Sequence, residues 1–171
     1  MVKFHDACEY ANNVSIVMEL CEGVVLELSP NGSLAFLLDG SKDEMKWGIK
    51  FKVAQGTTES LRYLHKGCKW RIIHRDIKAT NILLTKDFEL PQICDFELAK
   101  WLPEHWTHHT VSKFESAFGY LAPEYLMHGI INKKIDVFAF DILLLELVTG
   151  RKALDYSRQS LVLWVQTYFC S

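Results

Sequence analysis

The longest apolar patterns along the chain have helical spacing. Between residues 47 and 65, apolar side chains recur near one face of a helix: Ile49, Val53, Leu61 and Leu64. Gly67 follows as a stop signal. Between residues 135 and 148 almost every side chain is apolar, and Gly150 follows. The first pattern predicts a helix over 47–65 with one buried face, and the second predicts a helix over 135–148 that is buried on every side.

Shorter apolar runs predict strands. Val24–Leu28 is rich in β-branched and apolar residues, and it is followed by a turn over 29–33 and a short helix from Leu34. Ile16–Met18 fits a short strand, and Leu90–Cys94 fits one that leads into Asp95. A further helix begins near 160–164. Together these elements predict an α+β fold that is mainly α, with a few short strands.

No apolar stretch suits a membrane. Val14–Leu28 is interrupted by three glutamates, and the 135–148 helix is short and contains Asp141 and Glu146. The first residues lack a basic region followed by a clean apolar stretch, so a signal peptide is not expected. We therefore expect no membrane span and a cytoplasmic location.

Composition and charge narrow the class further. The chain has 171 residues and 49% hydrophobic content, which suits one folded domain. A net charge of -2 gives no reason to expect nucleic acid as a partner. Five cysteines without a paired CxxC spacing indicate free thiols in a reducing compartment. His105, His108 and His109 have no acidic or cysteine partner in register, so we expect no metal site there.

The stretch from Ile73 to Leu84 has apolar ends and a polar centre. Asp76 could accept a proton, Lys78 could neutralise phosphate charge, and Asn81 could hold a metal ion through its oxygen. A catalytic or metal-binding loop between two strands uses such residues. The alternative is a polar surface turn in which Asp76 and Lys78 are solvated.

Three motifs in order favour the catalytic interpretation. His74-Arg75-Asp76, with Asn81 five residues after the aspartate, resembles the catalytic loop of protein kinases. Asp95-Phe96-Glu97 and Ala122-Pro123-Glu124 follow, also in kinase order. From Val24 to about Trp164 the chain is similar to the plant receptor-like cytoplasmic protein kinases. Chance matches in an unrelated α/β protein are the weakest alternative.

The resemblance implies a fold and domain limits. Residues 24–171 would form a partial protein kinase domain, comprising the hinge and a C-terminal lobe that lacks its last helices. Residues 1–23 would be an unassigned remnant of an N-terminal lobe that is largely missing. The predicted core is Leu61, Leu64, Ile82, Leu83, Phe138, Ile142 and Leu145. Because such a lobe would expose apolar surface of the 135–148 helix, we expect marginal stability and a tendency to associate.

The resemblance also implies an activity, which is transfer of the γ-phosphoryl group of ATP to a serine or threonine hydroxyl of a protein. Asp76 would accept the hydroxyl proton, and Lys78 would neutralise charge on the phosphoryl group. Asn81 and Asp95 would hold Mg²⁺. The backbones of Glu27 and Ser29 would bond the adenine edge, with Leu26 at the back of the nucleotide pocket and Leu83 as a further nucleotide contact.

Other roles follow from the same resemblance. Asp136 would brace the catalytic loop by bonding its backbone. A phosphate on Thr107, Thr110 or Ser112 of a mobile activation segment could pair with Arg75. Glu124, whose usual arginine partner lies far downstream in the family, would be unpaired.

Four departures from the family pattern favour an alternative function. No G-x-G-x-x-G loop or strand lysine occurs upstream, and Glu97 and Asp141 stand where the family has glycine. Ser116 and Ala117 replace a Gly-Thr pair, which removes a hydroxyl near the catalytic aspartate. The alternative is a catalytically inactive kinase fragment. It would bind a partner kinase or a small GTPase, or it would be a truncated product without function.

Overall fold

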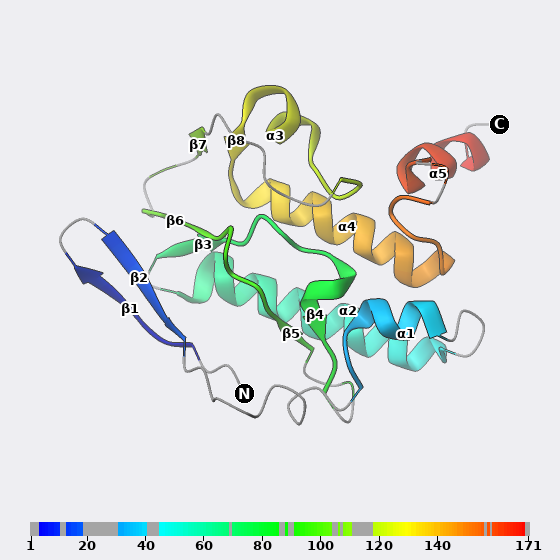
Figure 1. Ribbon diagram of the computed structural model, residues 1–171, viewed down its shortest axis with the longest axis horizontal. Coiled ribbons are helices and arrows are strands. Elements are labelled where there is room, and N and C mark those ends of the chain that lie inside the picture. Colours follow the sequence, from blue (N-terminus) through cyan, green and yellow to red (C-terminus); the bar gives the residue numbers. More distant parts are fainter. Residues whose placement is uncertain are drawn as a thin grey trace.

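The computed structural model describes residues 4–10, 13–18, 31–40, 45–68, 70–85, 88, 91–103, 106, 108–110, 118–155, 157 and 159–169. Within these ranges the chain is mainly helical, with a few short strands (Figure 1). The predicted strand Val24–Leu28 lies outside the described residues, as do Leu26, Glu27 and Ser29.

The described residues contain five α-helices: α1 (Leu34–Gly40), α2 (Trp47–Arg62), α3 (Pro123–His128), α4 (Lys133–Thr149) and α5 (Leu161–Phe169). A π-helical turn, Tyr63–Gly67, continues α2. Helix α2 packs on α4, and α5 packs on the far end of α4 (Figure 1). The predicted helices at 34, 47–65, 135–148 and 160–164 are therefore confirmed, with α4 slightly longer than expected.

The strands in the described residues form four antiparallel pairs. Hairpin β1 (Phe4–Tyr10) and β2 (Asn13–Met18) contains the strand expected at 16–18. The other pairs are β3 (Arg71–Ile73) with β6 (Lys100–Leu102), β4 (Ile82–Leu83) with β5 (Gln92–Ile93), and β7 (His109–Thr110) with β8 (Ile130–Ile131). Because β3 and β4 belong to different pairs, the polar residues 74–81 bridge two sheets. In Figure 1 this bridging segment passes between α2 and α4.

Helix α4 has defined ends and one exposed side. The Asn132 side chain accepts a hydrogen bond from the Lys134 amide (2.7 Å), and Gly150 ends the helix in the left-handed conformation (φ 66°). The prediction of burial on every side is wrong, because Val137 and Val148 are 46% and 57% exposed. Asp141 lies on this exposed side, four residues after Val137. The residue as a whole is exposed, although partial burial still raises the pKa of the Asp141 carboxyl above its ordinary value.

The core surrounds the polar segment. One cluster joins α1, α2, β4 and α4 through side chains that include Leu34, Val53, Ile82 and Leu143. A second cluster centres on Ile73 and Tyr125. Of the predicted core residues, Leu61, Leu64, Ile82 and Ile142 are buried, whereas Leu83, Phe138 and Leu145 are only half-buried. In the ranges given above, no helix combines the length and apolarity that a membrane span requires.

Candidate active site

The loop that follows β3 is held by one buried carboxylate. Asp136, in the first turn of α4, is 1% exposed. Its two oxygens accept hydrogen bonds from the backbone amides of His74 and Arg75, each at 2.8 Å. Asp136 therefore braces the catalytic-loop motif, as the resemblance implied.

A histidine that sequence reasoning missed completes this brace. His65 Nε2 lies 2.8 Å from Asp136 Oδ2, and the His65 side chain is 8% exposed. The π-helical turn Tyr63–Gly67 carries His65, and such turns often occur at functional sites. Asp136 thus accepts hydrogen bonds from the loop amides and from His65. These bonds offset part of the cost of burying its carboxylate.

Arg75 adopts a strained conformation and is held by its side chain. Its φ is 69°, a left-handed value that non-glycine residues adopt rarely. The guanidinium donates to the Leu98 carbonyl (2.9 Å) and to the Tyr125 hydroxyl (2.6 Å), and the residue is 8% exposed. These bonds, with that from the Arg75 amide to Asp136, fix the backbone just before Asp76.

The side chains of Lys78 and Asn81 both contact the Asp76 carboxylate. Lys78 Nζ lies 2.6 Å from Asp76 Oδ2, and Asn81 Nδ2 donates to the same oxygen at 3.0 Å. Asn81 Nδ2 also donates to the Asp76 carbonyl (2.9 Å), which closes the loop on itself. Asp76 is 5% exposed. A lysine ammonium and a side-chain amide therefore both donate to one nearly buried carboxylate oxygen.

His74 is buried in its neutral form. Its Nε2 lies 3.1 Å from the Cys94 carbonyl, and its Nδ1 accepts a bond from the Asp76 amide (3.3 Å). One neutral tautomer, with the proton on Nε2, satisfies both contacts. The ring also meets Phe96 edge-on at 4.7 Å between centroids. Burial is the largest influence on His74, and it lowers the pKa of the ring below its ordinary value.

We expect this depressed His74 pKa to make stability fall in mild acid. The His74 ring takes up a proton near pH 6.5 in the unfolded chain but only at lower pH in the folded chain. Its contribution to the free energy of unfolding is therefore fully present above pH 6.5. It is lost as pH falls toward the folded pKa, at no more than about 1.4 kcal/mol per pH unit. Urea unfolding of His74→Phe and of wild type, measured between pH 6.5 and the folded pKa, gives the free energy of unfolding of each protein. This free energy should depend less steeply on pH in the variant.

Exposed His128, at the end of α3, provides the matched control. His128→Gln should keep the wild-type dependence on pH, since it replaces an exposed ring and leaves His74 in place. An equal slope in His74→Phe and wild type would show that the His74 ring is not held neutral.

Strand pairing brings Asp95 next to Asn81. Ile82 pairs with Ile93, and the Cys94 amide donates to the Asn81 carbonyl at 3.0 Å. Asp95 follows at once, exposed and with a left-handed φ of 65°. The backbone pairing thus brings residues of two distant motifs side by side. Glu97 is also exposed, two residues further on.

Leu83 lies beside the segment that follows the predicted hinge. It forms a bridge with Ser33, and the Leu84 amide donates to the Gly32 carbonyl (3.0 Å). Leu83 is half-buried. Ser116, Ala117, Thr107 and Ser112 lie outside the described residues, as do the hinge positions.

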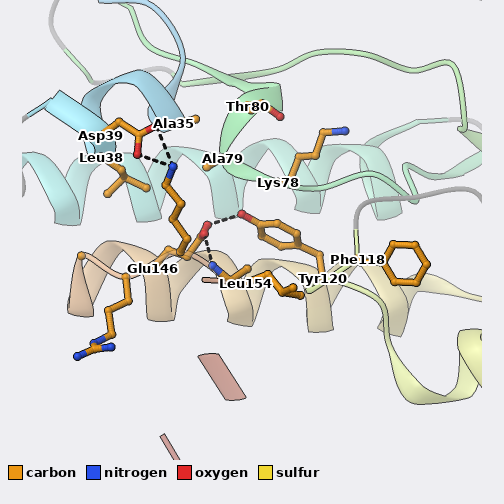
Figure 2. A pocket seen from close by; sticks show the side chains of 14 residues that line it. Ala35, Leu38, Asp39, Lys78, Ala79, Thr80, Phe118, Tyr120, Glu146 and Leu154 are labelled. Atoms are coloured by element: carbon orange, nitrogen blue, oxygen red, sulfur yellow. Dashed lines mark hydrogen bonds and ion pairs between the residues drawn. The ribbon is translucent and has the colours of Figure 1, made fainter. Parts of the chain in front are cut away.

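A pocket of about 310 Å³ adjoins the cluster, between α1 and the end of α4 (Figure 2). Lys78 and Thr80 of the loop form part of its wall. Sequence reasoning did not identify its central contact, in which the Tyr120 hydroxyl donates to Glu146. Burial raises the pKa of the Glu146 carboxyl above its ordinary value.

Two further sequence expectations concern charged groups. Within the part of the chain that the structure describes, Glu124 makes no ion pair. No group of three or more His, Cys, Asp or Glu in those residues is arranged to hold a metal ion. The Asn81 side-chain oxygen and the Asp95 carboxylate are oxygen donors of the kind that Mg²⁺ prefers.

Comparison with known proteins agrees with these motifs. The family model of the protein kinase domain matches residues 1–166. Two Arabidopsis thaliana proteins, the receptor-like cytosolic serine/threonine-protein kinases RBK2 and RBK1, are 65% and 59% identical to the chain over 84% of its length. The proline-rich receptor-like protein kinase PERK5 of the same plant is 45% identical over 84% of the chain.

The chain spans 31% of the length of RBK2 and of RBK1, and 22% of that of PERK5. The kinase motifs lie in the expected order, and the family model covers nearly every residue. The chain belongs to the protein kinase domain family.

Proposed function

We propose that the chain binds ATP with Mg²⁺ and transfers the γ-phosphoryl group to a serine or threonine hydroxyl of a protein. The observation that carries the proposal is the Asp76–Lys78–Asn81 cluster, fixed by Asp136 in a member of the kinase family. Catalysis of this kind depends on positioning and electrostatics, and the cluster supplies both. The names of the relatives support the serine/threonine class and a cytosolic location.

Each residue has a defined part in the proposed reaction. Asp76 orients the attacking hydroxyl and takes its proton as the oxygen bonds to the γ-phosphorus and the bond to the β-phosphate oxygen breaks. Lys78, now 2.6 Å from Asp76, offsets charge on the transferring group. A bound Mg²⁺ would neutralise phosphate charge, and Asn81 and Asp95 offer the oxygen ligands that this ion prefers.

The nucleotide would lie where β4 meets the segment after the hinge. The Ser33–Leu83 bridge places Leu83 beside that segment, which supports a role for Leu83 against the adenine. The backbones of Glu27 and Ser29 remain proposed adenine contacts. We also propose that residues 24–171 form the hinge and C-terminal lobe. The relatives' names give no support to the small GTPase or partner kinase considered above.

Binding of Mg²⁺-ATP should raise the stability of the chain through Asp95. A ligand that binds only the folded state adds RT ln(1 + [L]/Kd), which is about 2.7 kcal/mol at a hundredfold excess over Kd. We expect Mg²⁺-ATP to raise the melting temperature of wild type and to raise that of Asp95→Asn much less. Without Mg²⁺ the two proteins should behave alike.

Glu97→Gln is the matched control, since it also removes one exposed carboxylate from this segment. It should keep the full response to Mg²⁺-ATP. A cooperative wild-type melt that is indifferent to Mg²⁺-ATP would contradict the proposed function.

A further inference from the structure

One side of helix α4 carries a regular stripe of exposed residues. Lys134, Val137, Asp141 and Val148 are exposed, and half-buried Leu144 lies between the last two. The steps between them alternate between three and four residues, which keeps all of them on one side of the helix and is the spacing of a contact between two helices. Because Val137 and Val148 are 46% and 57% exposed, the stripe presents apolar surface to water.

The two charged members of this stripe have no partner of the opposite sign. In the ranges that the structure describes, neither Lys134 nor Asp141 takes part in an ion pair. The positions three and four residues from Asp141 along the helix are all apolar: Val137, Phe138, Leu144 and Leu145. Partial burial among such neighbours raises the pKa of the Asp141 carboxyl. A cation brought close to this carboxylate would therefore be a favourable contact.

Lys134 and Asp141 are spaced to pair between two copies of the helix. They lie seven residues apart, which is about 10 Å along the helix axis. A two-fold axis makes every contact occur twice, with the two residues exchanged between the copies. If two α4 helices pack antiparallel with Lys134 opposite the partner's Asp141, the reverse pair forms at the other end of the contact. Val137 of each copy then lies at the centre.

We propose that the exposed side of α4 binds a second copy of this chain, in an antiparallel contact that pairs Lys134 of each copy with the partner's Asp141. The two Val137 side chains pack between the ion pairs and leave water. A second copy fits better than an unrelated protein, because the cation and the anion lie on either side of the centre and make the stripe complementary to itself. Exposed ion pairs contribute little to affinity, so the dimer is weak and the charges decide which surfaces can meet.

Sedimentation velocity of the full chain, at concentrations from about 1 μM to 1 mM, tests this proposal. Wild type should shift from monomer to dimer as the concentration rises. Lys134→Glu and Asp141→Lys should each weaken the dimer by at least about 10-fold, because each turns both ion pairs into like-charge contacts. An equal mixture of the two variants should dimerise again, since both contacts between the different chains then join a cation to an anion.

Two controls separate the interface from general effects of charge and folding. Lys46→Glu makes the same change of charge at the start of α2, outside the stripe, and it should dimerise as wild type does. Circular dichroism of each variant reports whether it is folded. Lys134 and Asp141 are exposed, so we expect both substitutions to keep the wild-type spectrum.

A wild-type chain that stays monomeric over the whole range would overturn the proposal. So would a dimer that both single substitutions leave unchanged, because its interface would lie elsewhere. A mixture of folded variants that stays monomeric would overturn it as well. None of these measurements uses ATP or Mg²⁺, so their outcome is independent of the proposed phosphoryl transfer.

Discussion

Replacing Asp136 with alanine is expected to lower the free energy of unfolding by about 3–5 kcal/mol. The carboxylate accepts bonds from two loop amides and from His65, each at 2.8 Å, at a site that is 1% exposed. Its loss leaves two buried N–H groups without an acceptor, at about 1–3 kcal/mol for each. A domain is commonly stable by only about 5–15 kcal/mol, so the effect is large. Urea unfolding followed by circular dichroism measures it.

Two variants make this prediction specific. Asp136→Asn keeps one acceptor oxygen and should lose less stability than the alanine variant. Asp141→Asn removes a carboxylate from the exposed side of the same helix, and surface changes of this kind usually alter stability by less than about 0.5 kcal/mol. If the free energy of unfolding of Asp136→Ala lies within about 1 kcal/mol of the wild-type value, the Asp136 side chain does not hold the loop. Loss of any cooperative transition in that variant alone agrees with the prediction.

Helix positions could be predicted from the sequence, but the burial of individual residues could not. The apolar run at 135–148 and Gly150 located α4 well, because composition and a left-handed cap are local signals. Whether Val137 and Val148 are buried depends on which elements cover each side of α4. A helix with apolar residues on all sides does not indicate which side remains exposed. Leu83 and Leu145 were misjudged for the same reason, since their exposure is decided by distant segments.

The candidate site could be predicted to the level of motifs. The resemblance of His74-Arg75-Asp76 and Asn81 to the kinase catalytic loop indicated Asp76, Lys78 and Asn81, and in the structure Lys78 and Asn81 both contact the Asp76 carboxylate. The structure also brings Asn81 beside Asp95 through the β4–β5 pair, which the order of motifs implied without geometry.

Two contacts had no sequence signal. His65 reaches Asp136, 71 residues further along the chain, from a π-helical turn. Tyr120 and Glu146 are 26 residues apart and belong to no common motif. Both contacts depend on tertiary packing.

Tertiary packing also decides the partners of Arg75. The resemblance predicted that Arg75 pairs with a phosphate, and in the structure its guanidinium donates to the Leu98 carbonyl and the Tyr125 hydroxyl. Its pairing with phosphate stays a prediction.

Asp76→Asn is expected to lower the rate of phosphoryl transfer to a serine peptide by about 10²- to 10⁴-fold, the usual contribution of a positioned acid or base. An amide has nearly the same shape, but it cannot take the hydroxyl proton. It also offers no charge to Lys78, which now lies 2.6 Å from Asp76. Transfer of labelled phosphate from ATP to the serine peptide measures the rate.

Loss of catalysis must be separated from loss of structure, because Asp76 also accepts a hydrogen bond from Asn81. Glu59→Gln, the same chemical change on the exposed face of α2, should keep the wild-type rate. Asp76→Asn should still be stabilised by Mg²⁺-ATP, since the proposed magnesium ligands Asn81 and Asp95 remain. A variant that binds Mg²⁺-ATP but transfers phosphate slowly would place the chemistry at Asp76. A variant as fast as wild type would show that this carboxylate takes no part in proton transfer.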